Sequence, residues 1–327
     1  KITISEILNV TLSVGISRCK DNLANSKMYA KQGIDMALGR GGDQVALKTE
    51  SGYDFFGGVS KGIEKRTKVK TRIVAKALLE LINSSDNILI MGHIFSDLDC
   101  LVASMGLYGA IKRVKPKVNI VIDSQKTMAK PLYTDLCENG YTDAFISPEK
   151  APQYINDKTL LIIVDTHTPN FVESREVYEA CKNVVVVDHH RKMVEYIDNE
   201  VIFFHEPYAS SASEMVAELI QYLGSDFILT PKEAEAVLSG IMLDTKNFIL
   251  KTGVRTFEAA AYLRKLGADT VEVKKLFATS MSTYQGRTSL VSAAEIYNNC
   301  AIVLTDGNNI DNIKIIAPQT VDELLNI

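Results

Sequence analysis

A run of four consecutive valines, residues 184–187, constrains the fold of this chain more than any other stretch. An unbroken apolar run of this kind is typical of a parallel strand that is buried on both faces. The run ends in Asp188, His189 and His190. Because ligands of open α/β sheets bind outside the carboxyl ends of the strands, this polar triplet stands where chemistry is expected.

Two further apolar runs, residues 88–91 and 160–164, also end in carboxylates and imidazoles. The side chains that follow these two runs are His93, Asp97, Asp99, Asp165 and His167. The chain has five histidines, and four of them follow the three apolar runs. Histidines scattered for structural reasons would not be expected to gather at the ends of strands.

Strand-like and helix-like patterns alternate through residues 86–187, which predicts an α/β fold with a doubly wound, mostly parallel sheet. Between the three apolar runs we expect a strand at 118–122 and helices near 99–114, 131–138 and 173–182. After the histidine pair the pattern becomes helical, with helices expected at about 213–223, 231–242 and 255–266.

The first 50 residues predict a strand, a helix and a strand. Residues 10–16 alternate as a strand does, Asn22 is a candidate cap for a helix that ends near Leu38, and residues 44–47 form a short strand. Gly41, Gly42 and Asp43 follow the helix, so we interpret them as its C-cap and a turn.

A basic run from Lys61 to Lys76 follows this N-terminal segment. It could be a nucleic-acid patch, but the solvated face of a connecting helix is favoured. The apolar residues Val69, Ile73, Ala77 and Leu81 recur at helical spacing and are expected on its buried face.

The chain beyond residue 276 predicts a smaller second lobe built from strands. Residues 296–304 and 313–316 are the expected partners, paired across a turn at Asp306-Gly307-Asn308-Asn309.

Charge and cysteine content limit the class of protein. The formal net charge is −4, which argues against binding of duplex nucleic acid through a basic face. The five cysteines include no C-x-x-C pair, which predicts a reducing compartment without a zinc knuckle or disulfide framework. No apolar run is long enough to span a bilayer. Because the sequence begins at Lys1, we expect a fragment of a longer protein whose missing part could hold a membrane anchor.

The carboxylates at the strand ends predict a metal centre. Asp244, at the end of an apolar helix, adds a further aspartate to the set. So many aspartates cannot all be buried as bare anions, because desolvation and mutual repulsion are costly. Carboxylates with some imidazole and no thiolate favour Mn²⁺ or Mg²⁺ over zinc or copper. Their number suits two ions that share a bridging carboxylate, roughly 3.5–4 Å apart, as in enzymes that attack phosphorus.

Each of these residues also has a plain structural explanation. Asp97 and Asp99 could cap the following helix, and Asp165 and Asp188 could cap helices after parallel strands. Any one of these explanations is about as good as a functional one, but together they do not account for the gathering of histidines. His167 is the weakest member of the set, and His205 is interpreted as a surface or core residue outside it.

The order and spacing of these motifs resemble those of the DHH phosphoesterases, a superfamily of exonucleases, exopolyphosphatases, family II pyrophosphatases and small-nucleotide phosphodiesterases. The resemblance covers about residues 84–327. It implies that Asp165 bridges two Mn²⁺ ions, with Mg²⁺ or Co²⁺ as substitutes. It also implies that Asp188 orients His189 from behind and that His190 faces the substrate phosphate. The implied ligands are His93, Asp97 and Asp165 for one ion, and Asp99, Asp165, His189 and Asp244 for the other.

The serine-rich stretch at residues 210–213 is similar to a turn near the site of that superfamily, which implies substrate contacts for Ser211 and Ser213. Ser211 with Glu214 is also the pattern of a helix capping box. Both interpretations hold together, because a helix N-terminus favours phosphate binding.

Residues 11–17 and 28–33 resemble the C-terminal part of a GGDEF domain. A GGDEF domain joined to a DHH domain is similar to the GdpP (YybT) type of cyclic-di-AMP phosphodiesterase. That resemblance implies a hydrolase that converts cyclic-di-AMP to linear pApA, attached as a homodimer to the cytoplasmic face of a bacterial membrane through segments not included here. The family's regulatory GGDEF domain is degenerate.

The implied domains are a GGDEF-like segment at 1–60, a connecting helix at 61–83, the DHH domain at 84–268 and the start of a substrate-binding DHHA1 lobe at 269–327. The glycine-rich G-G-G-H segment of that lobe is absent from this sequence, so we expect the lobe to be truncated. Two alternatives remain open for the function. One is an oligoribonuclease (nanoRNase) or pAp phosphatase of the same superfamily, and the other is a sensor that binds a nucleotide without turnover.

Overall fold

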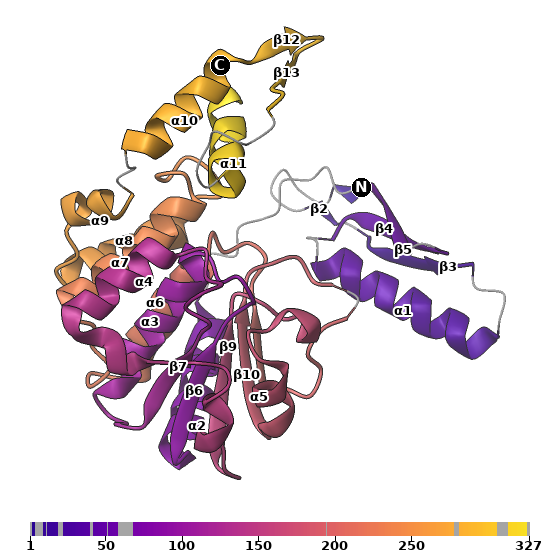
Figure 1. The fold of residues 1–327 in the computed structure, drawn as a ribbon. Helices are drawn as coiled ribbons and strands as arrows, with labels where there is room; N and C mark the ends of the chain where they lie inside the picture. The colour runs from indigo at the N-terminus through magenta and orange to yellow at the C-terminus, as the bar shows by residue number, and fades with distance from the viewer. Residues whose placement is uncertain are drawn as a thin grey trace. The chain divides into compact units, whose positions relative to one another are not determined.

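The computed structural model describes residues 2–3, 9–10, 12–18, 22–39, 42–50, 52–57, 68–193, 195–277, 281–305 and 313–325. The chain divides into two compact units, residues 1–273 and 274–327. Figure 1 shows the helices and strands of both units.

The larger unit is organised around one sheet of six strands in the order β11-β10-β9-β6-β7-β8. Every neighbouring pair in this sheet is parallel, so the predicted parallel sheet is confirmed. In the register, Val187 of β10 pairs with Val164 of β9 and Met91 of β6 pairs with Ile163, so three strands end at one edge. The strands are β6 (Asn87–Met91), β7 (Val118–Val121), β8 (Phe145–Ile146), β9 (Thr159–Val164), β10 (Asn183–Asp188) and β11 (Ile202–His205).

Both faces of the sheet are covered, because the apolar runs of its central strands β6, β9 and β10 are buried on both faces. Alternate residues such as Met91 and Val186 pack with Val177 of α5 (Arg175–Ala180) in one core, and their neighbours point to the opposite face. On the sheet, α3 contacts β6, β7 and β9, α6 contacts β10, and α2 contacts β11. The helices α7 and α8 pack on α6.

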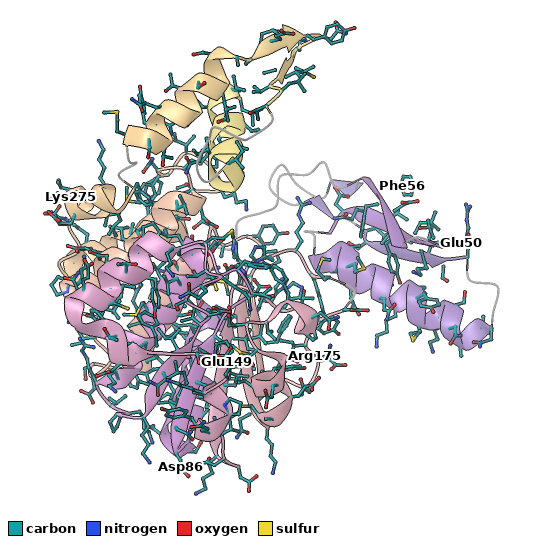
Figure 2. All side chains as sticks on the ribbon, in the orientation of Figure 1. Glu50, Phe56, Asp86, Glu149, Arg175 and Lys275 are labelled. Carbon is teal, nitrogen blue, oxygen red and sulfur yellow. The ribbon has the colours of Figure 1, made fainter. Side chains whose placement is uncertain are left out.

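Charged side chains such as Asp86 and Arg175 are exposed (Figure 2). The other α-helices described between residues 68 and 277 are α2 (Val69–Ser84), α3 (Leu98–Lys112), α4 (Lys130–Leu136), α6 (Ala212–Leu223), α7 (Pro231–Asp244), α8 (Val254–Lys265) and α9 (Thr270–Leu276).

The N-terminal segment forms a small sheet in the order β3-β4-β5, with β3 parallel to β4 and β4 antiparallel to β5. Asn22 caps α1 by accepting a hydrogen bond from the Asn25 amide at 2.8 Å, as predicted. Gly42, at φ +71° in the predicted turn, donates its amide to Ala37 at 2.8 Å. Gly15 lets α1 approach β3, because a Cβ there would stand 1.9 Å from the Ala30 carbonyl oxygen. The elements are β1 (Ile2–Thr3), β2 (Asn9–Val10), β3 (Val14–Ser17), α1 (Leu23–Gly39), β4 (Gln44–Thr49) and β5 (Gly52–Gly57).

The connecting helix exists, but its predicted buried face is wrong. Val69 and Ile73 of α2 are 57% and 65% exposed. The residues that pack inward are Thr71, Val74, Ala75, Leu78 and Ile82. The apolar residues of α2 are compatible with two different buried faces. The contacts of α2 with α6 and β11 determine that the face with Val74 and Leu78 is the buried one. The basic residues 61–67 lie outside the described residues.

Three elements differ from the sequence prediction. The chain after the histidine pair first forms β11, a short edge strand that the helical pattern did not indicate. The predicted strand 296–304 is a hairpin of β12 (Glu295–Tyr297) and β13 (Cys300–Ile302), because Asn298 and Asn299 adopt positive φ and form its turn. The predicted strand 313–316 is the start of the helix α11 (Ile313–Leu324), and α10 (Met281–Ser292) precedes the hairpin. The predicted turn at 306–309 lies outside the described residues.

The predicted domain boundaries stay a prediction. Within the described ranges, none of the helices combines the length and the apolar character needed to cross a membrane.

Candidate metal centre

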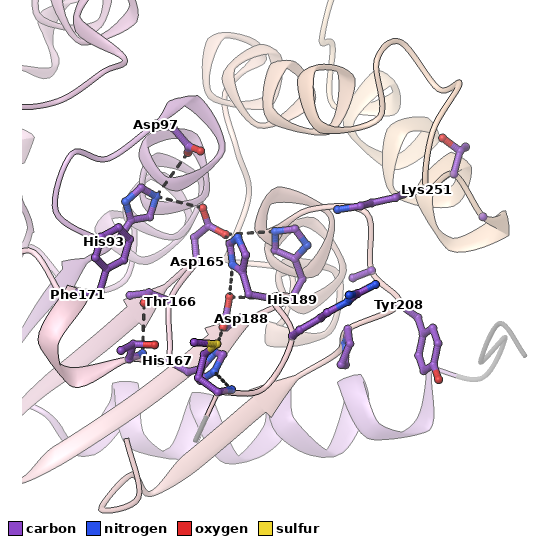
Figure 3. A pocket seen from close by; sticks show the side chains of 18 of the residues that line it. His93, Asp97, Asp165, Thr166, His167, Phe171, Asp188, His189, Tyr208 and Lys251 are labelled. Atoms are coloured by element: carbon purple, nitrogen blue, oxygen red, sulfur yellow. Dashed lines mark hydrogen bonds and ion pairs between the residues drawn. The ribbon is translucent and has the colours of Figure 1, made fainter. Parts of the chain in front are cut away.

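The edge where β6, β9 and β10 end gathers the side chains that the sequence singled out (Figure 3). Asp188 is the last residue of β10, Asp165 follows β9 and His93 follows β6. The N-terminus of α3 adds Asp97 and Asp99, and the last residue of α7 is Asp244. All six proposed ligands, contributed by four separate segments, therefore meet in one place.

His93 is at the centre of the first group of ligands. Its Nε2 lies 3.8 Å from Oδ1 of Asp97 and 3.6 Å from Oδ2 of Asp165. Its Nδ1 is 2.9 Å from the Ile94 carbonyl oxygen, so Nδ1 carries the hydrogen and Nε2 presents a lone pair in the neutral ring. The ring stacks on Phe171, with 5.3 Å between ring centroids. The ring is thus held in the orientation that a metal ligand requires.

His189 is at the centre of the second group. Its Nε2 lies 3.3 Å from Oδ1 of Asp165 and 3.8 Å from Oδ2 of both Asp99 and Asp244. One imidazole nitrogen and three carboxylate oxygens therefore face one point. We call these two groups the His93 set and the His189 set.

Asp165 belongs to both sets and offers a different oxygen to each. Its side chain is 3% exposed, and among the described residues its Oδ1 is buried without a hydrogen-bond partner. Its backbone is at φ +59°, a conformation that costs energy in a non-glycine residue and that Asp tolerates better than most. A buried carboxylate oxygen without a donor fits a cation, so the donors around Asp165 suit divalent metal.

Asp99 is fixed by the N-terminus of α6. Its oxygens accept hydrogen bonds from the Ala212 amide at 2.7 Å, the Ser213 amide at 3.0 Å and the Ser213 hydroxyl. Gly240 makes this approach of α7 to α3 and α6 feasible, because a Cβ there would stand 2.2 Å from Ser213 Oγ and 2.9 Å from Asp99 Oδ1. The second ligand set is therefore built by helix packing.

The two predicted substrate-binding serines have other partners in the structure. Ser211 caps α6 by accepting from the Glu214 amide at 3.0 Å, while the Glu214 carboxylate turns to Ser210 and Thr256. Only half of the predicted capping box is formed. Ser211 and Ser213 are fully buried and are not among the residues that line the cavity. The positions of these two serines do not support direct contact with a substrate. Ser213 instead orients Asp99.

Asp188 has different partners from those expected. It is fully buried and accepts hydrogen bonds from His167 Nδ1, from the His190 amide at 3.2 Å and from His190 Nδ1 at 2.9 Å. It therefore orients His190 and His167 and makes no hydrogen bond to His189 that the structure records. His205 lies closer to the site than predicted, because its Nε2 is 2.6 Å from the His190 carbonyl oxygen. Sequence reasoning missed β11, which places His205 beside Asp188.

The two sets differ in their pKa values. Burial opposes protonation of His93, but the nearby carboxylates of Asp165 and Asp97 outweigh it and raise the pKa of this histidine. Burial raises the pKa of Asp99 well above its usual value, with Asp165 and Asp244 adding to the effect. Burial raises the pKa of Asp244 to about 6, although His189 opposes the shift. For His189 burial is outweighed by Asp165 and Asp99, and its pKa rises to about 9. In the metal-free site, bound protons thus offset the negative charge of the carboxylates that bound cations would offset.

A cavity of about 1300 Å³ opens over the ligand sets. Phe171 and Tyr208 line it and are 46% and 38% exposed. Lys251 reaches toward His189 from the segment after α7 (Figure 3). In this segment residues 246–248 and 251 have positive φ values between 46° and 65°, a costly backbone path that places the lysine at the cavity. The sequence offered no signal for Phe171, Tyr208 or Lys251, since none of them follows a strand directly.

Comparison with known proteins identifies two families in this chain. Residues 87–241 match the family described as DHH family, N-terminal domain. The chain carries a DHH-family domain. Residues 1–55 match the cyclic-di-AMP phosphodiesterase GdpP-like GGDEF domain. The predicted resemblance to both domains is therefore confirmed.

Two relatives extend the similarity over nearly the whole chain. The cyclic-di-AMP phosphodiesterase GdpP of Geobacillus thermodenitrificans is 43% identical over 97% of this chain and 49% of that protein. The cyclic-di-AMP phosphodiesterase PdeA of Listeria monocytogenes is 38% identical over 99% of this chain and 50% of that protein. The chain thus spans about half the length of the curated relatives it matches.

Among solved structures, an exopolyphosphatase-related protein from Bacteroides fragilis superposes with a TM-score of 0.66. It is 21% identical, and the match covers 80% of this chain and 78% of that one. This likeness concerns the fold.

Proposed function

We propose that this chain contains the catalytic domain of a phosphodiesterase that hydrolyses cyclic-di-AMP to linear pApA with two divalent cations, Mn²⁺ first among them. The observation that carries the proposal is the split of the Asp165 carboxylate, with Oδ2 3.6 Å from His93 Nε2 and Oδ1 3.3 Å from His189 Nε2. Two divalent cations held here would supply a water of lowered pKa and stabilise charge on phosphoryl oxygens. The relatives' names supply the nucleotide.

In this proposal the ligands are those that the family resemblance implied. One cation would be held by His93, Asp97 and Asp165. The other would be held by Asp99, Asp165, His189 and Asp244. Oxygen-rich sets with one imidazole each favour Mn²⁺ or Mg²⁺.

His190 is the proposed contact to the substrate phosphate. Its side chain is 55% exposed, and Asp188 holds its Nδ1 at 2.9 Å, so Nε2 is the nitrogen left for the substrate. The hydrogen bond to Asp188 raises the pKa of His190 against the opposing effect of burial. A protonated imidazole there would donate to a non-bridging oxygen and stabilise its growing negative charge.

Lys251 is a further proposed phosphate contact. In the described part of the chain it lines the cavity and has no ion-pair partner within 4 Å, and its charge opposes the rise in the pKa of Asp244. A cyclic dinucleotide carries two phosphates, and only one can be at the ligand sets. We assign the other phosphate, or an oxygen of the first, to this ammonium group.

The exposed rings of Phe171 and Tyr208 can stack with nucleobases, which favours a nucleotide over inorganic polyphosphate as the ligand. The cavity of about 1300 Å³ exceeds the usual size of a small-molecule site, roughly 300–1000 Å³. It therefore has room for a dinucleotide.

The deciding experiment measures Mn²⁺-dependent hydrolysis of cyclic-di-AMP, cyclic-di-GMP and pApA by chromatography. It uses this chain and a version extended to the length of its relatives. Preferred cleavage of cyclic-di-AMP supports the proposal. Cleavage of pApA alone would assign the chain to the oligoribonuclease and pAp phosphatase group. Binding of nucleotide and metal without any turnover would favour a sensor.

A Lys251→Met variant tests the phosphate contact. We expect KM for the dinucleotide to rise by about 10-fold, with Mn²⁺ affinity changed far less. Lys246→Met is the matched control, because Lys246 is in the same segment and does not line the cavity. An equal rise in KM in both variants would mean that Lys251 acts only through the charge of the segment.

The context of the whole protein also stays a proposal. We infer that the full-length protein is a homodimer attached to the cytoplasmic face of a bacterial membrane. Crosslinking and cell fractionation of the full-length protein test this inference. A monomer released with the soluble fraction would refute it.

A further inference from the structure

Cys100 lies beside the His93 set and has no part in the proposed reaction. It is 1% exposed. Its sulfur, a ring nitrogen of His93 and a carboxylate oxygen of Asp165 all lie within 4.8 Å of one another, and all three residues are buried. A sulfur donor thus stands next to the nitrogen and oxygen donors of the first ligand set.

The position of the sulfur is fixed by the backbone. Asp97 caps α3 by accepting a hydrogen bond from the Cys100 amide at 3.0 Å, so both residues are held in one helical turn. A Cβ on Gly92 would stand 1.9 Å from Cys100 Sγ, so the sulfur lies directly against the chain that leads into His93. Little rearrangement is therefore needed for the sulfur to join the His93 set.

Three donors gather at this corner, a ring nitrogen of His93, the sulfur of Cys100 and a carboxylate oxygen of Asp165. Asp97 offers an oxygen 3.8 Å from His93 Nε2 as a fourth. Zn²⁺ and Cd²⁺ bind such mixed sets tetrahedrally, whereas Mn²⁺ and Mg²⁺ prefer oxygen and do not need the thiol. We propose that the His93 set is also a site for a thiophilic divalent cation, with Cys100 as its fourth ligand. On binding, the thiol loses its proton to solvent as the metal–sulfur bond forms, without any change in oxidation state.

This second binding mode would inhibit hydrolysis. Four protein donors complete a tetrahedron and leave no position for water, which is the arrangement of structural rather than catalytic zinc sites. The inhibitory consequence rests on the proposed function, but the coordination itself does not. Trace Zn²⁺ would therefore hold the enzyme inactive until Mn²⁺ or a chelator removes it.

Cobalt is the probe for the sulfur ligand, because Co²⁺ occupies zinc sites and reports its ligands by absorption. We titrate the metal-free chain with Co²⁺ and expect a thiolate-to-cobalt charge-transfer band in the near ultraviolet. Cys100→Ser should lose this band. Cys181→Ser should keep it, since Cys181 is the other buried thiol among the described residues of this unit and lies in the core under α5. Zn²⁺ affinity should fall by about 10- to 100-fold in Cys100→Ser, while Mn²⁺ affinity stays within about 3-fold.

The wild-type spectrum decides the question even if the variant folds poorly. Two Co²⁺ ions bound by calorimetry without a charge-transfer band would overturn the sulfur ligand and leave the proposed function standing. A band that persists in Cys100→Ser would also overturn it, because another thiol would then be the ligand. Failure to bind any Co²⁺ would overturn both proposals. A clear band in a protein that hydrolyses none of the three nucleotides with Mn²⁺ would refute the proposed function alone.

Discussion

The His93 set and the His189 set share Asp165 but balance their charges differently. In the His93 set a histidine carries the proton, and burial of Asp97 is outweighed by His93, which lowers the pKa of Asp97. In the His189 set the pKa of the histidine is also raised, to about 9, and burial raises the pKa values of the carboxyl groups of Asp99 and Asp244 as well. The Asp97 side chain is 44% exposed and the Asp99 side chain is 1% exposed. Water therefore reaches the Asp97 carboxylate of one set, whereas packed helices enclose the Asp99 carboxylate of the other.

The largest expected effect comes from Asp165→Asn, which removes the charge that both sets share. Asn keeps the size of the side chain and tolerates the positive φ of this position, so we expect the fold to survive. Turnover should fall by at least about 1000-fold, because both cations lose a ligand. Hydrolysis and metal stoichiometry check this expectation. Binding of two Mn²⁺ ions with wild-type affinity would show that Asp165 does not bridge.

His93→Ala and His189→Ala separate the two sets. Each variant should bind one cation in place of two, with turnover lower by about 100- to 1000-fold. Calorimetric stoichiometry in both variants measures this directly. If either variant still binds two ions tightly, the assignment of that histidine is wrong.

The pH dependence of binding should differ between the sets. Asp244 has a raised pKa of about 6, so it is protonated below that pH and must lose its proton before it can bind a cation. His189, with a pKa of about 9, must lose its proton too. Mn²⁺ affinity of the His189 set should therefore fall by up to about 10-fold per pH unit as pH drops below about 9, and more steeply below about 6. Titrations of His93→Ala, which keeps the His189 set intact, isolate this effect. Affinity that does not change between pH 7 and pH 5 would contradict it.

The smallest expected effect is that of Ser213→Ala, which removes the hydroxyl that donates to Asp99. We expect the cation of the His189 set to bind about 10-fold more weakly, with little change at the His93 set. Ser210→Ala is the matched control, because this buried serine bonds Glu214 and not Asp99. Similar losses in both variants would indicate general damage to the N-terminus of α6.

The sequence predicted much of the fold around β6, β9 and β10 because these strands are buried on both faces and read as unbroken apolar runs. It failed where the pattern permits two solutions. The apolar residues of α2 fit two helical phases, and the short edge strand β11 lacks a distinctive pattern. The stretch 296–304 was predicted as one strand because the turn at Asn298 and Asn299 was not recognised.

By itself the sequence determined which residues could hold cations, since acidic and imidazole side chains stood at three strand ends and one helix end. Only the tertiary structure decided their partners. In the folded chain Asp188 accepts hydrogen bonds from His167 and His190, and Ser213 donates one to Asp99. Cys100 and Lys251 also lie at the site. The physical reason is that strand ends are encoded locally by apolar runs. Hydrogen bonds between α3, α6 and α7 depend instead on how distant helices pack, which no local pattern records.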